Sequence, residues 1–138
     1  MSSARGSSRR KRKNMRRTPK TTPEEDYLAA AVALQLARDK YDHKTSNKAY
    51  DKLYVAARKI RLHSADGGEA FFGSLLNHTM PYVSLCAAFN LIPFNPKLAQ
   101  AIYKRLAKGP AGEVRIAAEM TLNEWKAGRL DPDWFMKE

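Results

Sequence analysis

The sequence contains very little cysteine, no long apolar run and no strand pattern, and each absence excludes a class of protein. Its single cysteine, Cys86, can form neither an intramolecular disulfide nor a zinc site built from cysteines. No stretch approaches the ~20 apolar residues that a membrane-spanning helix needs. No segment alternates apolar and polar residues with enrichment in β-branched side chains. We therefore expect a soluble all-α protein that does not associate with membranes.

The first 20 residues lack acidic side chains altogether. They hold nine of the 25 Lys and Arg residues and none of the 14 Asp and Glu residues, which leaves 16 basic and 14 acidic residues at positions 21–138. The net charge of +11 for the whole chain thus falls to +2 outside this segment. No apolar stretch precedes Tyr27, so a secretory signal is not expected and the cytoplasm is the predicted location.

Residues 1–21 also have almost nothing to bury, so they cannot offset the entropic cost of ordering. We predict a disordered basic tail over residues 1–21 and one helical domain over residues 22–138. If translation starts at Met15 rather than at Met1, most of the tail's charges are never made. The charges that could attract a polyanion such as nucleic acid are Arg9, Arg10, Lys11, Arg12, Lys13, Arg16 and Arg17.

The domain opens with helix signals. The run Thr22-Pro23-Glu24-Glu25 offers a hydroxyl N-cap, a proline at the first helical position and a glutamate that can reach back to the N–H of the cap. Apolar residues from Tyr27 to Tyr41 recur at a spacing near 3.6, which predicts one buried face on a helix that ends at about Asp42. Thr45-Ser46-Asn47 then predicts the cap of a second, antiparallel helix that ends before a Gly-Gly pair.

The second half of the chain repeats itself. Residues 83–91 match residues 114–122 at an offset of 31 positions, which places Leu85 and Ile116 at equivalent core positions. Each copy holds two short helices joined by a turn, and such a unit buries its apolar face only by stacking on a neighbour. The predicted fold is therefore all-α, a short right-handed α-solenoid of about six helices.

The end of the chain carries its own turn signals. Gly128 is expected to end the last helix in the left-handed conformation. Trp134 and Phe135 are expected to fold back onto that last helix. On this prediction the two aromatic residues cap one end of the stack.

Two sets of residues resemble known families. Residues 80–88 resemble the Pro-x-Val-Arg-x-x-Ala-Ala second helix of HEAT repeats, with Ser84 in place of the usual arginine, and the next unit keeps Val114-Arg115. Residues 117–128, which end in Glu-Trp-Lys-x-Gly, and residues 47–53 are similar to a small bacterial family, the domain of unknown function numbered two thousand and nineteen. The resemblance covers about residues 25–130. It implies a HEAT-like helical fold, and it supplies no catalytic residue and no cofactor.

The reactive side chains form no catalytic or metal-binding pattern. His43, His63 and His78 fall at expected helix ends, where an imidazole interacts favourably with terminal carbonyls, and no ligand spacing accompanies them. Cys86 occupies the repeat position of Ala117, so a buried and inert thiol is expected rather than a nucleophile. We therefore expect no enzyme, no cofactor and no metal. The aromatic residues with helical spacing fit core or cap positions better than base stacking, and they are Tyr50, Tyr54, Tyr103, Trp125 and Trp134.

The leading functional hypothesis is a non-enzymatic protein-interaction module, because HEAT-like stacks bind through the surface of their second helices. The candidate contacts with a partner protein of unknown identity are Tyr82, Ser84, Asn90, Arg115 and Glu119.

Two alternatives remain open: a nucleic-acid-associated protein that uses its tail, and an immunity or antitoxin partner of a bacterial toxin. A stripe of lysines on the second helix is either a solvated face or a docking surface for an acidic protein or a nucleic-acid backbone. The stripe consists of Lys44, Lys48 and Lys52, with Lys59 further along.

Overall fold

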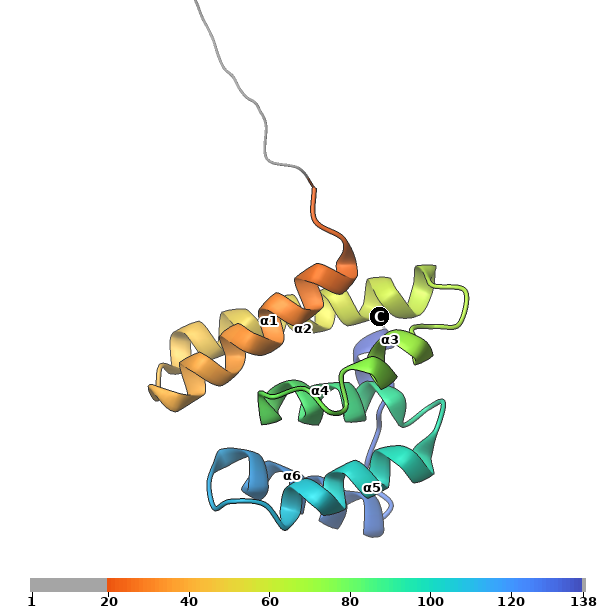
Figure 1. Cartoon of the computed structure of the whole chain (residues 1–138). Helices are drawn as coiled ribbons and strands as arrows, with labels where there is room; N and C mark the ends of the chain where they lie inside the picture. Colours follow the sequence, from red (N-terminus) through yellow and green to blue (C-terminus); the bar gives the residue numbers. More distant parts are fainter. Residues whose placement is uncertain (1–19, 138) are drawn as a thin grey trace, which may run out of the picture.

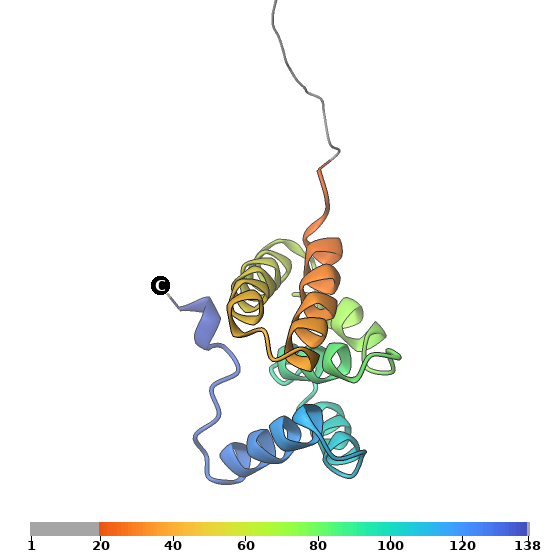
Figure 2. The same cartoon turned by 90° about the vertical axis from the view of Figure 1, so that its left-hand side faces the viewer.

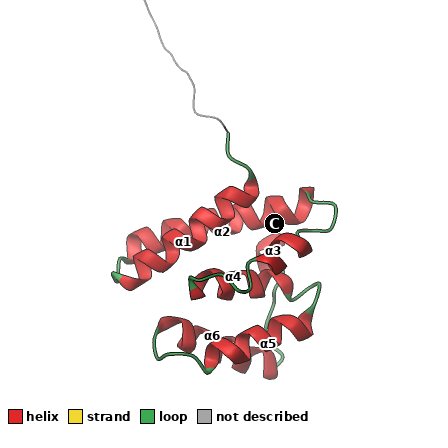
Figure 3. Cartoon of the chain, in the orientation of Figure 1, coloured by secondary structure: helices red, strands yellow, loops and turns green. Residues whose placement is uncertain are grey.

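The computed structural model describes residues 20–137, and these residues fold into helices without any strand (Figures 1 and 3). The all-α prediction is therefore confirmed for this part of the chain. The elements are α1 (Pro23–Asp39), α2 (His43–His63), α3 (Glu69–Ser74), α4 (Pro81–Leu91), α5 (Pro96–Ala107), α6 (Glu113–Lys126) and a short 3₁₀ turn, η2 (Trp134–Met136).

The start of α1 follows the predicted capping box. The Oγ1 atom of Thr22 accepts a hydrogen bond from the N–H of Glu25 at 3.1 Å, and the Glu25 carboxylate accepts one from the N–H of Thr22 at 2.9 Å. The helix ends at Asp39, three residues earlier than expected, because Tyr41 takes the left-handed conformation with φ of 56°. That turn leaves Tyr41 78% exposed, so its predicted inward position is wrong.

The second helix begins two residues before its predicted cap. Asp42 caps α2, since its Oδ1 atom accepts a hydrogen bond from the N–H of Thr45 at 3.1 Å. The prediction of a cap within Thr45-Ser46-Asn47 is therefore wrong. The two helices lie antiparallel (Figure 1) and bury Tyr27, Ala31, Leu34, Leu53, Ala57 and Ile60.

Helix α4 lies at the centre of the molecule. It contacts α1, α3, α5 and α6, and eight of its 11 residues are buried. Figure 2 shows the α1/α2 pair, then α4 beside α3, and then the α5/α6 pair in succession. A helix that has neighbours on several sides has no fully solvated face.

The last helix is much more exposed than its repeat partner. Ala118 is the one buried residue of α6. Ile116 is 54% exposed whereas Leu85 is only 7% exposed, so the prediction that both occupy core positions is wrong for Ile116. The physical reason is that α6 packs against α5 and more lightly against α4, and no described helix covers its outer side.

The chain after α6 crosses back to the first pair of helices. Gly128 has φ of 74° and ends α6 as predicted, with its N–H donating to the carbonyl of Trp125 at 3.0 Å. The segment then reaches α2 (Figure 2), where the Trp134 ring lies edge-on to Tyr54 at 4.7 Å between centroids. The prediction that Trp134 and Phe135 pack on the last helix is wrong, because α2 offers the aromatic partner Tyr54 for both rings.

Candidate functional site

An apolar groove of about 700 Å³ runs between α1 and α2. All of its lining residues belong to these two helices. Its floor contains the buried alanines Ala30, Ala49 and Ala56, and the exposed side chain of Val55 stands at its side. Because alanine side chains are short, the groove leaves the backbones of both helices close to the surface. The groove therefore suits an elongated ligand with an apolar face.

Lysines of the predicted stripe flank this groove. Lys48, Lys52 and Lys59 line it, together with Asp26 and Asp51. All three lysines are exposed, and within residues 20–137 none of them takes part in a salt bridge. The rim thus has a net positive charge, and Lys44, one turn earlier on α2, extends the positive side.

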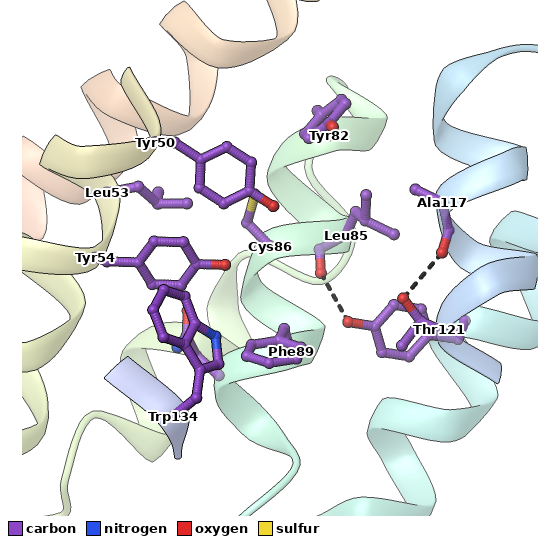
Figure 4. Close-up of a pocket in the computed structure, with 12 residues that line it drawn as sticks. Tyr50, Leu53, Tyr54, Tyr82, Leu85, Cys86, Phe89, Ala117, Thr121 and Trp134 are labelled. Carbon is purple, nitrogen blue, oxygen red and sulfur yellow. Dashed lines mark hydrogen bonds between the residues drawn. The ribbon is translucent and has the colours of Figure 1, made fainter. Parts of the chain in front are cut away.

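A second space, of about 440 Å³, lies between α2, α4 and α6 (Figure 4). The rings of Tyr50 and Tyr54 stack at 5.1 Å on the α2 side, and Trp134 of η2 lies against Tyr54. Burial is the main cause that raises the pKa of Tyr54, and it raises the pKa of Tyr82 to about 12. Both hydroxyls therefore stay protonated at neutral pH.

The candidate partner contacts divide into buried and exposed residues. Tyr82, Ser84 and Asn90 are buried in α4 and offer little surface to a partner. Tyr82 and Asn90 instead line the 440 Å³ cavity. Arg115 and Glu119 are exposed on α6 and form an i,i+4 ion pair at 4.0 Å. Tyr82 and Arg115 both line a recess of about 540 Å³, but the structure does not bring all five residues to one surface.

Most of the candidate polyanion-binding residues belong to the basic N-terminal segment, which precedes the described part of the chain. Lys44, Lys48 and Lys52 lie on α2, but the remaining candidates for polyanion binding precede the described residues. Those outside are Arg9, Arg10, Lys11, Arg12, Lys13, Arg16 and Arg17.

The histidines and the cysteine lie near their expected positions. His43 begins α2 and His63 ends it. His78 lies in the turn before α4, where its Nδ1 atom accepts the N–H of Met80 at 3.0 Å. Burial raises the pKa of Cys86 to about 12, so the thiolate that a nucleophile requires is scarce near neutral pH.

Sequence reasoning missed the groove altogether and treated the cavity aromatics only as core or cap residues. The groove could have been found from the small residues Ala29 and Ala33 on α1, which lie one turn apart and face the lysine side of α2. The cavity depends on Trp134 meeting Tyr54 of α2 across a long sequence distance, for which no local signal exists.

Comparison of the chain with protein-family models, with curated proteins and with solved structures finds no match. Across residues 20–137, no helix combines the length and the apolar character that crossing a bilayer requires. The same residues contain no group of three or more His, Cys, Asp or Glu side chains that could hold a metal ion. The described residues thus form an all-helical fold with an apolar groove between its first two helices.

Proposed function

We propose that this protein is a non-enzymatic interaction module, a short HEAT-like α-solenoid whose α1/α2 groove binds an acidic amphipathic helix of a partner protein. The observation that carries the proposal is the alanine-floored groove flanked by Lys48, Lys52 and Lys59. The HEAT-like motif around Val114-Arg115 and the similarity to the uncharacterised bacterial family support the solenoid assignment. An immunity or antitoxin role is a special case, in which the acidic helix would belong to a toxin.

The shape of the groove supports a helical partner. In a solenoid each pair of helices stacks on its neighbours, and a terminal pair keeps one face without a neighbour. The α1/α2 pair is the first pair in the described chain, and its groove is free of side chains from α3 to α6. Alanines at such a surface allow helix axes to approach to ~8–10 Å, which is the helix-in-groove mode of recognition.

The charge at the groove supports an acidic partner. Three exposed lysines outnumber the two aspartates that line it. An exposed ion pair contributes only ~0.2–1 kcal/mol, so the lysines would orient and select the helix. Burial of apolar side chains over the alanine floor would supply most of the affinity.

The test is fluorescence anisotropy of a labelled amphipathic peptide of about 18 residues, which spans roughly 27 Å as a helix. The peptide carries Leu at helical spacing and Glu along one flank, and a second peptide carries Lys at the Glu positions. We expect the full chain to bind the acidic peptide and not the basic one. The double variant Lys48→Glu/Lys52→Glu should weaken binding by about tenfold, since each pair turns from attraction to repulsion.

The matched control is Lys97→Glu/Lys104→Glu, which changes the net charge equally on α5, where both lysines are exposed. Binding by this control should stay close to that of the wild type. Equal losses in the two double variants would mean that only overall charge matters. That result, or absence of binding by the wild type, would refute the proposed groove.

A second candidate function, association with nucleic acid, rests on the nine basic residues among the first 20 positions. Neutralising Z phosphates of duplex DNA gives a log–log salt slope of about −0.9Z. A full-length variant with Arg9, Arg10, Lys11, Arg12 and Lys13 changed to Gln should then lose DNA affinity and show a shallower slope. If Gln at Lys44, Lys48 and Lys52 has the larger effect, α2 carries the DNA contact instead.

A further inference from the structure

The 440 Å³ cavity has no part in the groove and is built by equivalent positions of the two repeat units. Cys86 and Ala117 are separated by 31 positions and both line it, and the same offset relates Asn90 and Thr121. Helices α4 and α6 therefore turn the same face of the repeat toward this space. In Figure 4, α2 and α6 lie on opposite sides of α4, and the hydroxyls of Tyr50 and Tyr54 point toward the cavity.

The walls of the cavity are aromatic and uncharged. Six of the 12 lining residues are Tyr, Phe or Trp, and none is Asp, Glu, Lys, Arg or His. Two of its polar groups are already satisfied by the protein. The Thr121 hydroxyl donates to the carbonyl of Ala117 at 2.9 Å, and the Tyr103 hydroxyl donates to the carbonyl of Leu85 at 3.3 Å.

One buried donor at this wall is left without a partner. Asn90 is only 2% exposed, and its Oδ1 atom accepts a hydrogen bond from the Tyr27 hydroxyl at 2.6 Å. Its Nδ2 atom has no hydrogen-bond partner among the described residues. A buried N–H group without an acceptor is unfavourable, and native structures usually satisfy it. That nitrogen is itself inaccessible to solvent, so it lies behind the wall of the cavity and not on its surface.

The size of the space also indicates a ligand. A volume of about 440 Å³ falls in the range of small-molecule sites, which are mostly apolar with a few placed polar groups. Aromatic walls hold water poorly, whereas flat rings gain from stacked and edge-on contacts with Tyr50, Tyr54 and Trp134.

We propose that this cavity binds a neutral, planar aromatic molecule. The uncharged walls exclude an ionic ligand, because nothing there would compensate for its lost hydration. The ring contacts select a flat molecule. Trp134, which is 49% exposed, is one of the residues that line the cavity.

The probe for the test is prodan, a neutral naphthalene ketone whose emission shifts to the blue in apolar surroundings. We expect the emission of prodan to shift to the blue when it is mixed with the full chain, because the ring system is then buried against the aromatic walls. Bound prodan should also quench the emission of Trp134. The variant Trp134→Phe should remove most of that quenching, whereas Trp125→Phe should keep it.

Two matched variants locate the site. Ala117→Phe fills the cavity from α6 and should weaken prodan binding about tenfold or more, while circular dichroism checks that the variant stays helical. Ala29→Phe makes the same change in the α1/α2 groove and should leave prodan binding unchanged. The proposal is overturned if the wild type does not shift prodan emission, or if Ala117→Phe binds prodan as tightly as the wild type. It is also overturned if Ala29→Phe abolishes binding, since the probe would then occupy the groove.

Discussion

Gly68→Ala is expected to lower the free energy of unfolding by about 2 to 4 kcal/mol, through both backbone conformation and steric overlap. Gly68 precedes α3 with φ of 96°, where an L residue with a side chain is strained. A Cβ atom there would lie 2.5 Å from Cγ2 of Ile60 and 2.7 Å from Cε2 of Phe72, and both of these side chains are buried. Urea titration monitored by circular dichroism measures the change.

The matched control for this prediction is Gly73→Ala in α3. A Cβ atom at Gly73 meets nothing within 4 Å, so alanine should stabilise the helix by about 0.5 to 1 kcal/mol. The two substitutions add the same methyl group five positions apart and should therefore act in opposite directions. If Gly68→Ala were as stable as the wild type, the close packing of Ile60 and Phe72 around Gly68 would be wrong.

Features that depend on neighbouring residues were predictable from the sequence. The α1 cap at Thr22 and Glu25 is an example, because its hydrogen bonds join residues three apart. The left-handed end of α6 at Gly128 is another. The prediction failed where two possible caps lay close together, at Asp42 and at residues 45–47. Asp42 caps α2, since α1 already ends at Asp39 and the chain turns at the left-handed Tyr41.

Burial in α4 could have been inferred more fully. Apart from Ser84 and Asn90, the helix from Pro81 to Leu91 contains almost no strongly polar residue, and a helix that is apolar all round is buried on all sides. The resemblance to HEAT repeats, which bind through their second helices, led instead to the expectation of an exposed face. Equivalence in sequence does not imply equivalent burial, since α4 lies between other helices while α6 lies at the edge.

Long-range contacts were not accessible from the sequence. The C-terminal segment reaches α2 through the ion pair of Asp133 with Arg61, at 2.9 Å, and through Phe135 against Tyr54. These partners are separated by more than 70 positions, and α6 was an equally plausible support from the pattern alone. The cavity exists because this segment and α2 enclose space beside α4, so its prediction required the same contacts.

The second large effect is expected at the repeat pair Leu85 and Ile116. Leu85 is 7% exposed and packs in the core cluster, so Leu85→Ala should lower the free energy of unfolding by about 2 to 3 kcal/mol. This loss is toward the low end of the range for buried Leu→Ala substitutions. The reason is that Leu85 already borders the cavity, so its truncation removes fewer packing contacts. Ile116 is 54% exposed on α6, and Ile116→Ala should change stability by no more than about 0.5 kcal/mol.

The comparison of these two variants tests the arrangement of the helices, because the two side chains occupy the same repeat position and differ in their surroundings. Urea unfolding of the full chain and of both variants under identical conditions gives the two differences in free energy. A large loss for Ile116→Ala would mean that α6 has a covered outer face and that the stack continues past it, through a second copy or a partner. A negligible loss for Leu85→Ala would mean that α4 presents this face to solvent, and the cavity between α2, α4 and α6 would then not exist as described.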